Sequence, residues 1–265
     1  MEDNFSIKSA VIVGSGNVAW VLGTALQRSG IEIKAVCGRN IKSISNLAAE
    51  LDTDYFNFES TLPKADLILI TVSDDAIQRV SEELSSSLDS SNQLVAHTSG
   101  SKSTALLHPF KNKGSFYPLQ TMTKGNKVDF STVHFCIYSN ESEFRSGLIN
   151  LAKKLSKHVH TLDDKQRAIL HLSAVLVNNF ANLFFAEAYK LSQLNQIDFE
   201  LLRPLILKTA RKALESDPNI IQTGPAVRND LETIDFHLEL LKEDKDLQVL
   251  YDLVSKRIKK NADTP

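Results

Sequence analysis

The first 162 residues alternate short apolar runs, rich in β-branched side chains, with segments whose apolar residues recur at helical spacing. This alternation is typical of βαβ units around a parallel sheet that is buried on both faces. The apolar runs predict strands over residues 10–13, 33–37, 67–72, 94–97, 133–138 and 158–162. The amphipathic segments predict helices over residues 18–28, 41–51, 75–88 and 142–157.

After Asp163 the strand patterns stop, and apolar residues recur at helical spacing almost to the end. Helices are predicted over residues 164–194, 199–215, 226–241 and 247–259, with Thr223 as the N-cap of the third. The fold class is therefore α/β, with a Rossmann-type parallel sheet over 1–162 and an all-helical domain over 163–265. The first of these helices is apolar around much of its circumference and needs cover, which a second subunit would supply.

A glycine-rich segment, Gly14-Ser15-Gly16-Asn17-Val18-Ala19, joins the first predicted strand to the first helix. Gly14 permits a tight turn, Gly16 lets the backbone approach a pyrophosphate, and Ala19 lets the helix pack closely on the strand. An anion then lies at a helix N-terminus, where the free N–H groups and the dipole favour negative charge. This context predicts a dinucleotide site; the alternative is an ordinary strand-to-helix turn.

The second strand ends in Cys37-Gly38-Arg39-Asn40, where NAD-binding domains usually carry an acid for the ribose hydroxyls. Arg39 cannot accept those protons, but its planar fork suits a 2′-phosphate, which favours NADP(H) over NAD. Alternatively, Arg39 is a solvated loop residue. Val72 and Ser73 end a later strand, where the cofactor would cross the sheet edge.

Candidate catalytic groups follow at the same edge of the sheet. His97 ends a buried strand and is either a catalytic group or a core histidine bonded to backbone. Ser99 either contacts nicotinamide or substrate, or forms a turn before Gly100. Pro118 predicts a rigid loop that presents Tyr117 and Gln120 to substrate, although packing is the alternative for this tyrosine.

The long helix carries His171, Asn178 and Asn182 along one stripe at 3.6 residues per turn. They either line a cleft or pair polar groups across a subunit interface. No second ligand stands at metal-binding spacing from His171, so no metal site is expected.

Further along the chain, Arg228 either binds an anionic substrate or pairs with Glu232. Asp230, Thr233 and His237 share a helix face and either hold substrate or order the helical domain.

Four segments resemble a family of predicted NADP oxidoreductases that are related to pyrroline-5-carboxylate reductase and the deazaflavin-dependent NADP reductases. They are Gly14–Ala19, His97–Gly100, Ser115–Thr121 and Thr223–Asp230, the last with Thr233 and His237 downstream. The resemblance implies an NADP(H)-binding Rossmann domain, a helical domain of uncharacterised role, a cleft and a homodimer. Tyr117 departs from the family, which more often has histidine before Pro-Leu-Gln.

Composition excludes several other classes of protein. A formal net charge of -2 provides no basic field for nucleic acid, and no uninterrupted apolar run reaches membrane-spanning length. The acidic start Met1–Asn4 lacks the pattern of a secretory leader, so a cytoplasmic protein is expected. Cys37 and Cys136 lie in apolar runs and indicate reduced, buried thiols.

These patterns predict an NADP(H)-dependent oxidoreductase that transfers hydride to or from a small carbonyl or imine, with hydrogen bonds from His97, Tyr117 or His171. Related hydroxyacid dehydrogenases place lysine and asparagine four apart on the long helix, whereas here Lys165 is followed by Ile169. No general acid is assigned on that basis. The alternatives are a non-catalytic NADP sensor or scaffold, and a reductase with a flavin or deazaflavin as second cofactor.

Overall fold

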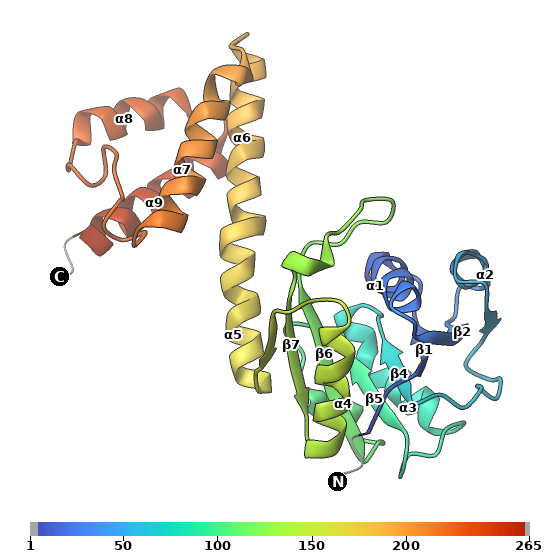
Figure 1. The fold of residues 1–265 in the computed structure, drawn as a ribbon. Helices are drawn as coiled ribbons and strands as arrows, with labels where there is room; N and C mark the ends of the chain where they lie inside the picture. The colour runs from blue at the N-terminus through green and yellow to red at the C-terminus, as the bar shows by residue number, and fades with distance from the viewer. Residues whose placement is uncertain (1–4, 263–265) are drawn as a thin grey trace. The chain divides into compact units, whose positions relative to one another are not determined.

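The computed structural model describes residues 5–262 and contains one eight-stranded sheet in the order β3-β2-β1-β4-β5-β6-β7-β8 (Figure 1). Neighbouring strands are parallel except for β6 and β7, which are antiparallel. The predicted α/β class with a Rossmann-type sheet is confirmed. The strands are β1 (Ser9–Val13), β2 (Glu32–Cys37), β3 (Asp54–Phe56), β4 (Leu67–Ile70), β5 (Leu94–His97), β6 (Asn112–Leu119), β7 (His134–Ser139) and β8 (Val159–Thr161).

Successive residues of each strand point to opposite sides of the sheet, so both faces are apolar, and helices cover both. Ile12 of β1 belongs to one buried apolar cluster, which includes residues of α1, α2 and α4, whereas Val11 and Val13 belong to a second cluster with α3. The helices and 3-10 turns of this part are α1 (Asn17–Arg28), α2 (Ile41–Glu50), η1 (Asp74–Ala76), α3 (Ile77–Ser85), η2 (Thr104–Leu107), η3 (Phe130–Thr132) and α4 (Ser142–Lys153).

The loop predicted over Tyr117–Gln120 is wrong, because β6 continues through Tyr117 and Pro118 to Leu119. Proline is tolerated there since β5 pairs only with residues 112–115 of β6. On the other side, Phe135 lies opposite Pro118 but donates its N–H to the His158 carbonyl of the next segment. No ladder hydrogen bond therefore requires the N–H that proline lacks.

One continuous helix covers residues 164–194, as predicted, and consists of α5 (Asp164–Ala174), η4 (Val175–Phe180) and α6 (Ala181–Leu194). It begins with a capping box between Asp163 and Gln166. The η4 segment is π-helical, a rare form often found at functional sites, and the sequence did not predict it. Its wider turn means that the 3.6-residue spacing used for Asn178 and Asn182 does not hold through η4.

The chain divides into two compact units, Met1–Asn182 and Leu183–Pro265. The domain boundary expected at residue 162 stays a prediction. The second unit contains the rest of α6, then η5 (Phe199–Leu202), α7 (Arg203–Glu215), α8 (Leu231–Leu240) and α9 (Lys245–Ala262).

The helix predicted over residues 226–241 begins later, and the assignment of Thr223 as its N-cap is wrong. Asp230 caps α8 instead, accepting a hydrogen bond of 3.1 Å from the Thr233 N–H. Gly224 and Asn229 adopt positive φ angles of 125° and 54°, which prevent a regular helix before that cap.

Among residues 5–262, the helix over 164–194 is long and apolar enough by composition to cross a membrane. Polar residues interrupt its apolar runs, although its mean hydropathy is high. A single helix of this length and composition does not establish a membrane span, because core helices of soluble proteins share both properties.

Candidate functional site

The turn after β1 has the geometry expected of an anion-binding turn. Gly14 has a φ of +116°, and a Cβ atom on it would lie 2.9 Å from Thr71 Oγ1. A Cβ atom on Gly16 would meet nothing within 4 Å, so this position faces open space. No side chain caps α1, so the N–H groups of Asn17 and Val18 in its first turn receive no hydrogen bond acceptor from a capping side chain.

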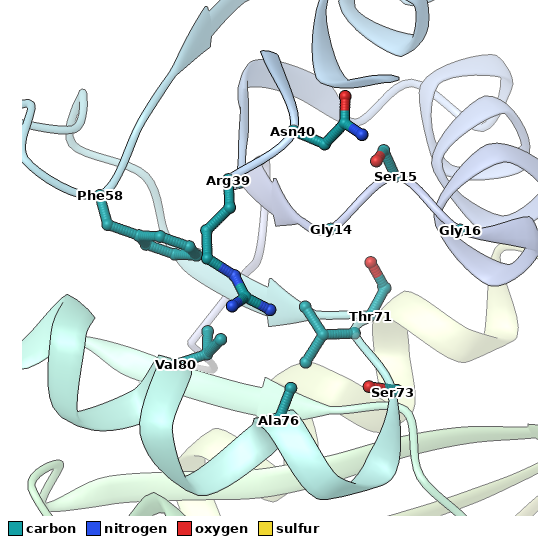
Figure 2. Close-up of a pocket in the computed structure, with 12 residues that line it drawn as sticks. Gly14, Ser15, Gly16, Arg39, Asn40, Phe58, Thr71, Ser73, Ala76 and Val80 are labelled. Carbon is teal, nitrogen blue, oxygen red and sulfur yellow. The ribbon is translucent and has the colours of Figure 1, made fainter. Parts of the chain in front are cut away.

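A cavity of about 390 Å³ opens at this turn (Figure 2). The first four strands of the sheet meet it at their carboxyl ends, the edge at which open α/β sheets bind ligands. Figure 2 shows the Arg39 side chain pointing into the cavity beside the Phe58 ring. The cavity is lined by six of the predicted cofactor residues, Gly14, Ser15, Gly16, Arg39, Val72 and Ser73, and by Gly38, Asn40, Phe58, Thr71, Ala76 and Val80.

A second cavity, of about 400 Å³, brings together four predicted site residues: Tyr117, Gln120, His171 and Asn178. Its walls come from the end of β6 and from α5 and η4. The Tyr117 hydroxyl lies 3.1 Å from His171 Nδ1, and Asn178 Nδ2 donates a hydrogen bond of 3.1 Å to Thr121 Oγ1. Burial raises the pKa of Tyr117 to about 12, so its hydroxyl is protonated at neutral pH.

Gly100 packs directly under the Tyr117–His171 pair. A Cβ atom there would lie 2.6 Å from His171 Nδ1 and 2.7 Å from Tyr117 Cζ, so no other residue fits without moving both rings. The glycine that ends the His97–Gly100 segment is thus a packing requirement of this cavity.

His97 is fully buried and lines neither cavity. Its Nδ1 accepts a hydrogen bond of 3.2 Å from the Ser99 N–H. Burial, with a smaller contribution from the charge of Arg167, lowers the pKa of His97 to about 4, so the ring is neutral at pH 7. Ser99 Oγ accepts from the N–H groups of Ser101 and Lys102, the geometry of the turn-forming alternative.

Arg167, a residue that sequence analysis did not select, is fully buried next to this segment. Its guanidinium donates to the carbonyls of Ser99 and Lys102, to Ser115 Oγ at 2.8 Å and to Asp164 Oδ1 at 2.8 Å. The sequence offers one indication of this role: Asp164 and Arg167 are three residues apart at the start of an otherwise apolar helix, a spacing that lets their side chains pair.

Asp164 extends this network to the loop that follows Gly100. Its Oδ2 accepts from Ser103 Oγ and from the N–H and hydroxyl of Thr104. Although burial opposes it, hydrogen bonds from Ser103 and Arg167 keep the pKa of Asp164 below its ordinary value. The network therefore fixes α5 and the Ser99–Thr104 loop to each other.

The remaining predicted residues lie elsewhere. Asn182 is exposed and does not line the second cavity. Arg228, in the second unit, lies 3.8 Å from Asp230 Oδ2 rather than pairing with Glu232. Thr233 Oγ1 donates to Asp230, and His237 Nδ1 lies 2.7 Å from the Tyr251 hydroxyl, contacts that order α8 and α9.

A metal centre and a reactive thiol are two further kinds of catalytic site. Within residues 5–262, no group of three or more histidine, cysteine or acidic side chains is arranged to hold a metal ion. Cys37 and Cys136 are buried free thiols, and burial raises their pKa values to about 12 and about 11. Thiols with such pKa values are poor nucleophiles at neutral pH.

The two glycines of the turn are expected to respond differently to alanine. Gly14→Ala will lower the free energy of unfolding by about 2 kcal/mol or more, because it combines a positive φ with contact against the Thr71 backbone. Gly16→Ala, the matched control, will change it by less than about 1 kcal/mol, because nothing occupies that space. Urea unfolding measures both; equal losses would contradict the geometry.

His97 makes the fold sensitive to acid. Its folded-state pKa is depressed, so the unfolded chain binds a proton first, and stability is lost as pH falls from 6.5 toward about 4. The expected loss is on the order of 3 kcal/mol, measured by urea unfolding across that range. His97→Asn will flatten this pH dependence, whereas His160→Asn, on an exposed residue, will retain it.

Comparison with known proteins relates both halves of the chain to described domains. Residues 4–121 match a Rossmann-like domain, and residues 133–258 match DUF2520, a domain of unknown function. No curated protein matches the chain. Among solved structures, an imine reductase from Myxococcus stipitatus in complex with NADP⁺ has 16% identity and a TM-score of 0.65, covering 95% of this chain and 93% of its own.

A 1-pyrroline-5-carboxylate reductase from Streptococcus pyogenes has 15% identity and a TM-score of 0.62, over 95% of this chain and 98% of its own. The predicted structural relation to pyrroline-5-carboxylate reductases is thus confirmed, while the relation to deazaflavin-dependent reductases stays a prediction. A Bacteroides fragilis protein provisionally designated an NADP oxidoreductase has 34% identity and a TM-score of 0.88, over 96% of this chain and 98% of its own. The chain belongs to the family of this Bacteroides protein, and its own Rossmann-like domain precedes its DUF2520 domain.

Proposed function

We propose that this protein is an NADP(H)-dependent oxidoreductase that transfers hydride to or from a small carbonyl or imine substrate. The observation that carries the proposal is the pairing of an open glycine-rich turn, beside an arginine-lined cavity, with a second cavity that contains Tyr117, His171 and Asn178. The family relative designated an NADP oxidoreductase and the NADP⁺ complex of the imine reductase support it.

The residues at the turn fit a dinucleotide. Gly16 leaves open space beside the uncapped start of α1, where the N–H groups of Asn17 and Val18 would hold the diphosphate. Arg39 would bind the 2′-phosphate of NADP(H) from inside the cavity. A bound nicotinamide would supply or accept the hydride, and Val72 and Ser73, which line the cavity, would orient it.

Tyr117 is the proposed proton donor to the substrate atom on which charge develops. Its pKa of about 12 keeps the hydroxyl protonated, and His171 Nδ1, 3.1 Å away, fixes its direction. When Nδ1 carries a proton and donates to the tyrosine oxygen, the phenolic proton is free to point into the cavity. Gln120 and Asn178, which line the same cavity, would hydrogen-bond the substrate.

His97 is proposed as a positioning residue rather than one that touches substrate. It is buried and bonded to the Ser99 N–H, which places Gly100 under the two rings of the cavity. A neutral imidazole in this position adds no charge to the core.

A homodimer and a cytoplasmic location complete the proposal. The long helix leaves large apolar side chains uncovered, among them Leu172 at 58%, Val177 at 77% and Leu194 at 70% exposure. Apolar side chains exposed along one helix are typical of an interaction surface, and a second copy would bury them. Two buried free thiols are typical of a reducing compartment.

The alternative function is an NADP sensor or scaffold without catalysis. Lys165 and Ile169 stand where the hydroxyacid dehydrogenases have a lysine and an asparagine, and both side chains are exposed. In a sensor or scaffold the cofactor site would still bind NADP(H), but Tyr117 would not donate a proton.

A turnover screen separates the two functions. Purified protein is incubated with NADPH and a panel of small aldehydes, ketones and cyclic imines, while absorbance of the reduced nicotinamide is followed. Consumption with at least one substrate class is expected. NADPH binding without consumption across the panel would favour the sensor, and absence of NADPH binding would overturn both functions.

Arg39→Asp is expected to reverse the cofactor preference. The ratio of NADH to NADPH dissociation constants will fall at least about tenfold, about 1.4 kcal/mol, because the carboxylate repels a 2′-phosphate and accepts ribose hydroxyls. Calorimetric titration of each cofactor measures this ratio. Arg211→Asp, on exposed α7, is the control and will leave it unchanged.

Tyr117→Phe is expected to lower kcat by about 10²-fold or more with little change in the NADPH dissociation constant. Tyr55→Phe, on the exposed edge strand β3, is the matched control. Since the pKa of Tyr117 is about 12, deprotonation of this group will not reduce kcat of the wild type up to about pH 10. An unchanged kcat in Tyr117→Phe would reject the assignment.

Light scattering coupled to gel filtration is expected to show a dimer of the 29.5 kDa chain. Leu172→Glu places a charge in the exposed apolar surface and will produce monomers. Lys42→Glu, on an exposed position of α2, is the control. A wild-type monomer at micromolar concentration would contradict the proposed assembly.

A further inference from the structure

A larger hollow lies along α1 and contains none of the residues assigned to the cofactor or substrate. It has a volume of about 760 Å³ and is bounded by α1, by the segment 124–131 and by the end of α4. It continues into a second hollow of about 400 Å³, since both are lined by Ser131, Lys154 and Leu155. We call the two together the α1–α4 groove.

The groove is strongly basic, although the whole chain has a net charge of -2. Its first hollow is lined by Arg28, Lys124, Lys127 and Lys154, and its second adds Lys153 and Lys157. Arg28 and Lys153 lie in the last turns of α1 and α4, where cations stabilise a helix, but Lys124 and Lys127 lie on a loop and have no such role.

These cations lack counter-ions among residues 5–262, where no ion pair involves any of them. Among the residues that the structure describes, two acids line the groove, Glu50 and Asp129. Of these, Asp129 Oδ1 already accepts hydrogen bonds from the N–H and hydroxyl of Ser131, and Glu50 forms no ion pair. Gathered cations without partners favour an anionic ligand.

The floor of the groove is apolar. Trp20, Val128, Phe130 and Leu155 line it and pack against the buried cluster beneath α1 and α4. Lys124 Nζ lies 3.4 Å from the centre of the Trp20 ring, so one cation is held directly over this floor. A ligand with both an anionic group and an apolar body matches the two kinds of surface.

The groove is also connected to the glycine-rich turn. The Lys124 N–H donates a hydrogen bond of 3.0 Å to Asn17 Oδ1, and Asn17 is the first residue of α1, next to Gly16. A ligand that moves Lys124 away from Trp20 would therefore act on the first turn of α1.

We propose that the α1–α4 groove binds a small organic phosphate, with its phosphate on Lys127 and Lys154 and its apolar body on Trp20, and that its occupancy changes the affinity of the glycine-rich turn for dinucleotide. The second part rests on the proposed function, whereas the binding site itself does not. Coupling of this kind is reciprocal, so each ligand changes the affinity of the other by the same factor.

Trp20 is the chain's single tryptophan, so its fluorescence reports directly on the groove. Phenyl phosphate is titrated into the full-length protein, and a saturable change in Trp20 emission is expected. The double variant K127A/K154A will raise the dissociation constant at least about tenfold, while K42A/K64A, on exposed lysines elsewhere, will not. Matching thermal melts establish that both variants fold, since all four side chains are outside the core.

The same titration is repeated with NADP⁺ at saturation. A dissociation constant for phenyl phosphate that changes at least about threefold supports the coupling, and an unchanged one overturns it. Loss of the signal through competition by NADP⁺ would place the probe in the cofactor cavity and overturn the site. The site would also be overturned if K127A/K154A bound phenyl phosphate as tightly as the wild type, or if inorganic phosphate bound as tightly as phenyl phosphate. Failure of NADP⁺ to bind would reject the proposed function alone.

Discussion

The geometry of the second cavity depends on one buried cation. Arg167 is wholly removed from water, and a guanidinium in that position is stable only when its N–H groups find acceptors. The chain supplies the Asp164 carboxylate, Ser115 Oγ and two loop carbonyls. The four acceptors come from three parts of the fold, so satisfying the charge holds β6, α5 and the loop after β5 in a single arrangement.

That arrangement explains how residues distant in sequence meet. With α5 fixed against the loop, His171 comes one turn after Arg167 and reaches the Tyr117 hydroxyl on β6. Gly100 completes the contact because no side chain fits beneath the two rings. The π-helical turn that follows contributes Asn178 to the same wall. The cavity is therefore a product of the charge network.

Two hollows beside α1 have different physical origins. At β1 the surface is backbone: the amide groups of the uncapped α1 and the absence of a Cβ atom at Gly16 leave room for an anion. Along the side of α1 the surface is side-chain charge over an apolar floor. Asn17 belongs to the first and contacts the second, which makes the start of α1 the shared element.

Sequence by itself determined what depends on local pattern: the alternation of strands and helices, the turn at Gly14–Ala19, the position of Arg39 at a strand end, and the long helix over 164–194. Such features follow from side-chain period and backbone preference within a few residues. The tertiary structure alone decided the rest. It made Tyr117–Leu119 part of a strand, because β5 does not extend to Pro118 and no hydrogen bond between strands needs the N–H that proline lacks. It also buried Arg167, because acceptors distant in sequence converge there. The periodicity of the sequence does not predict either feature, because each depends on contacts between parts of the chain that meet only in the folded protein.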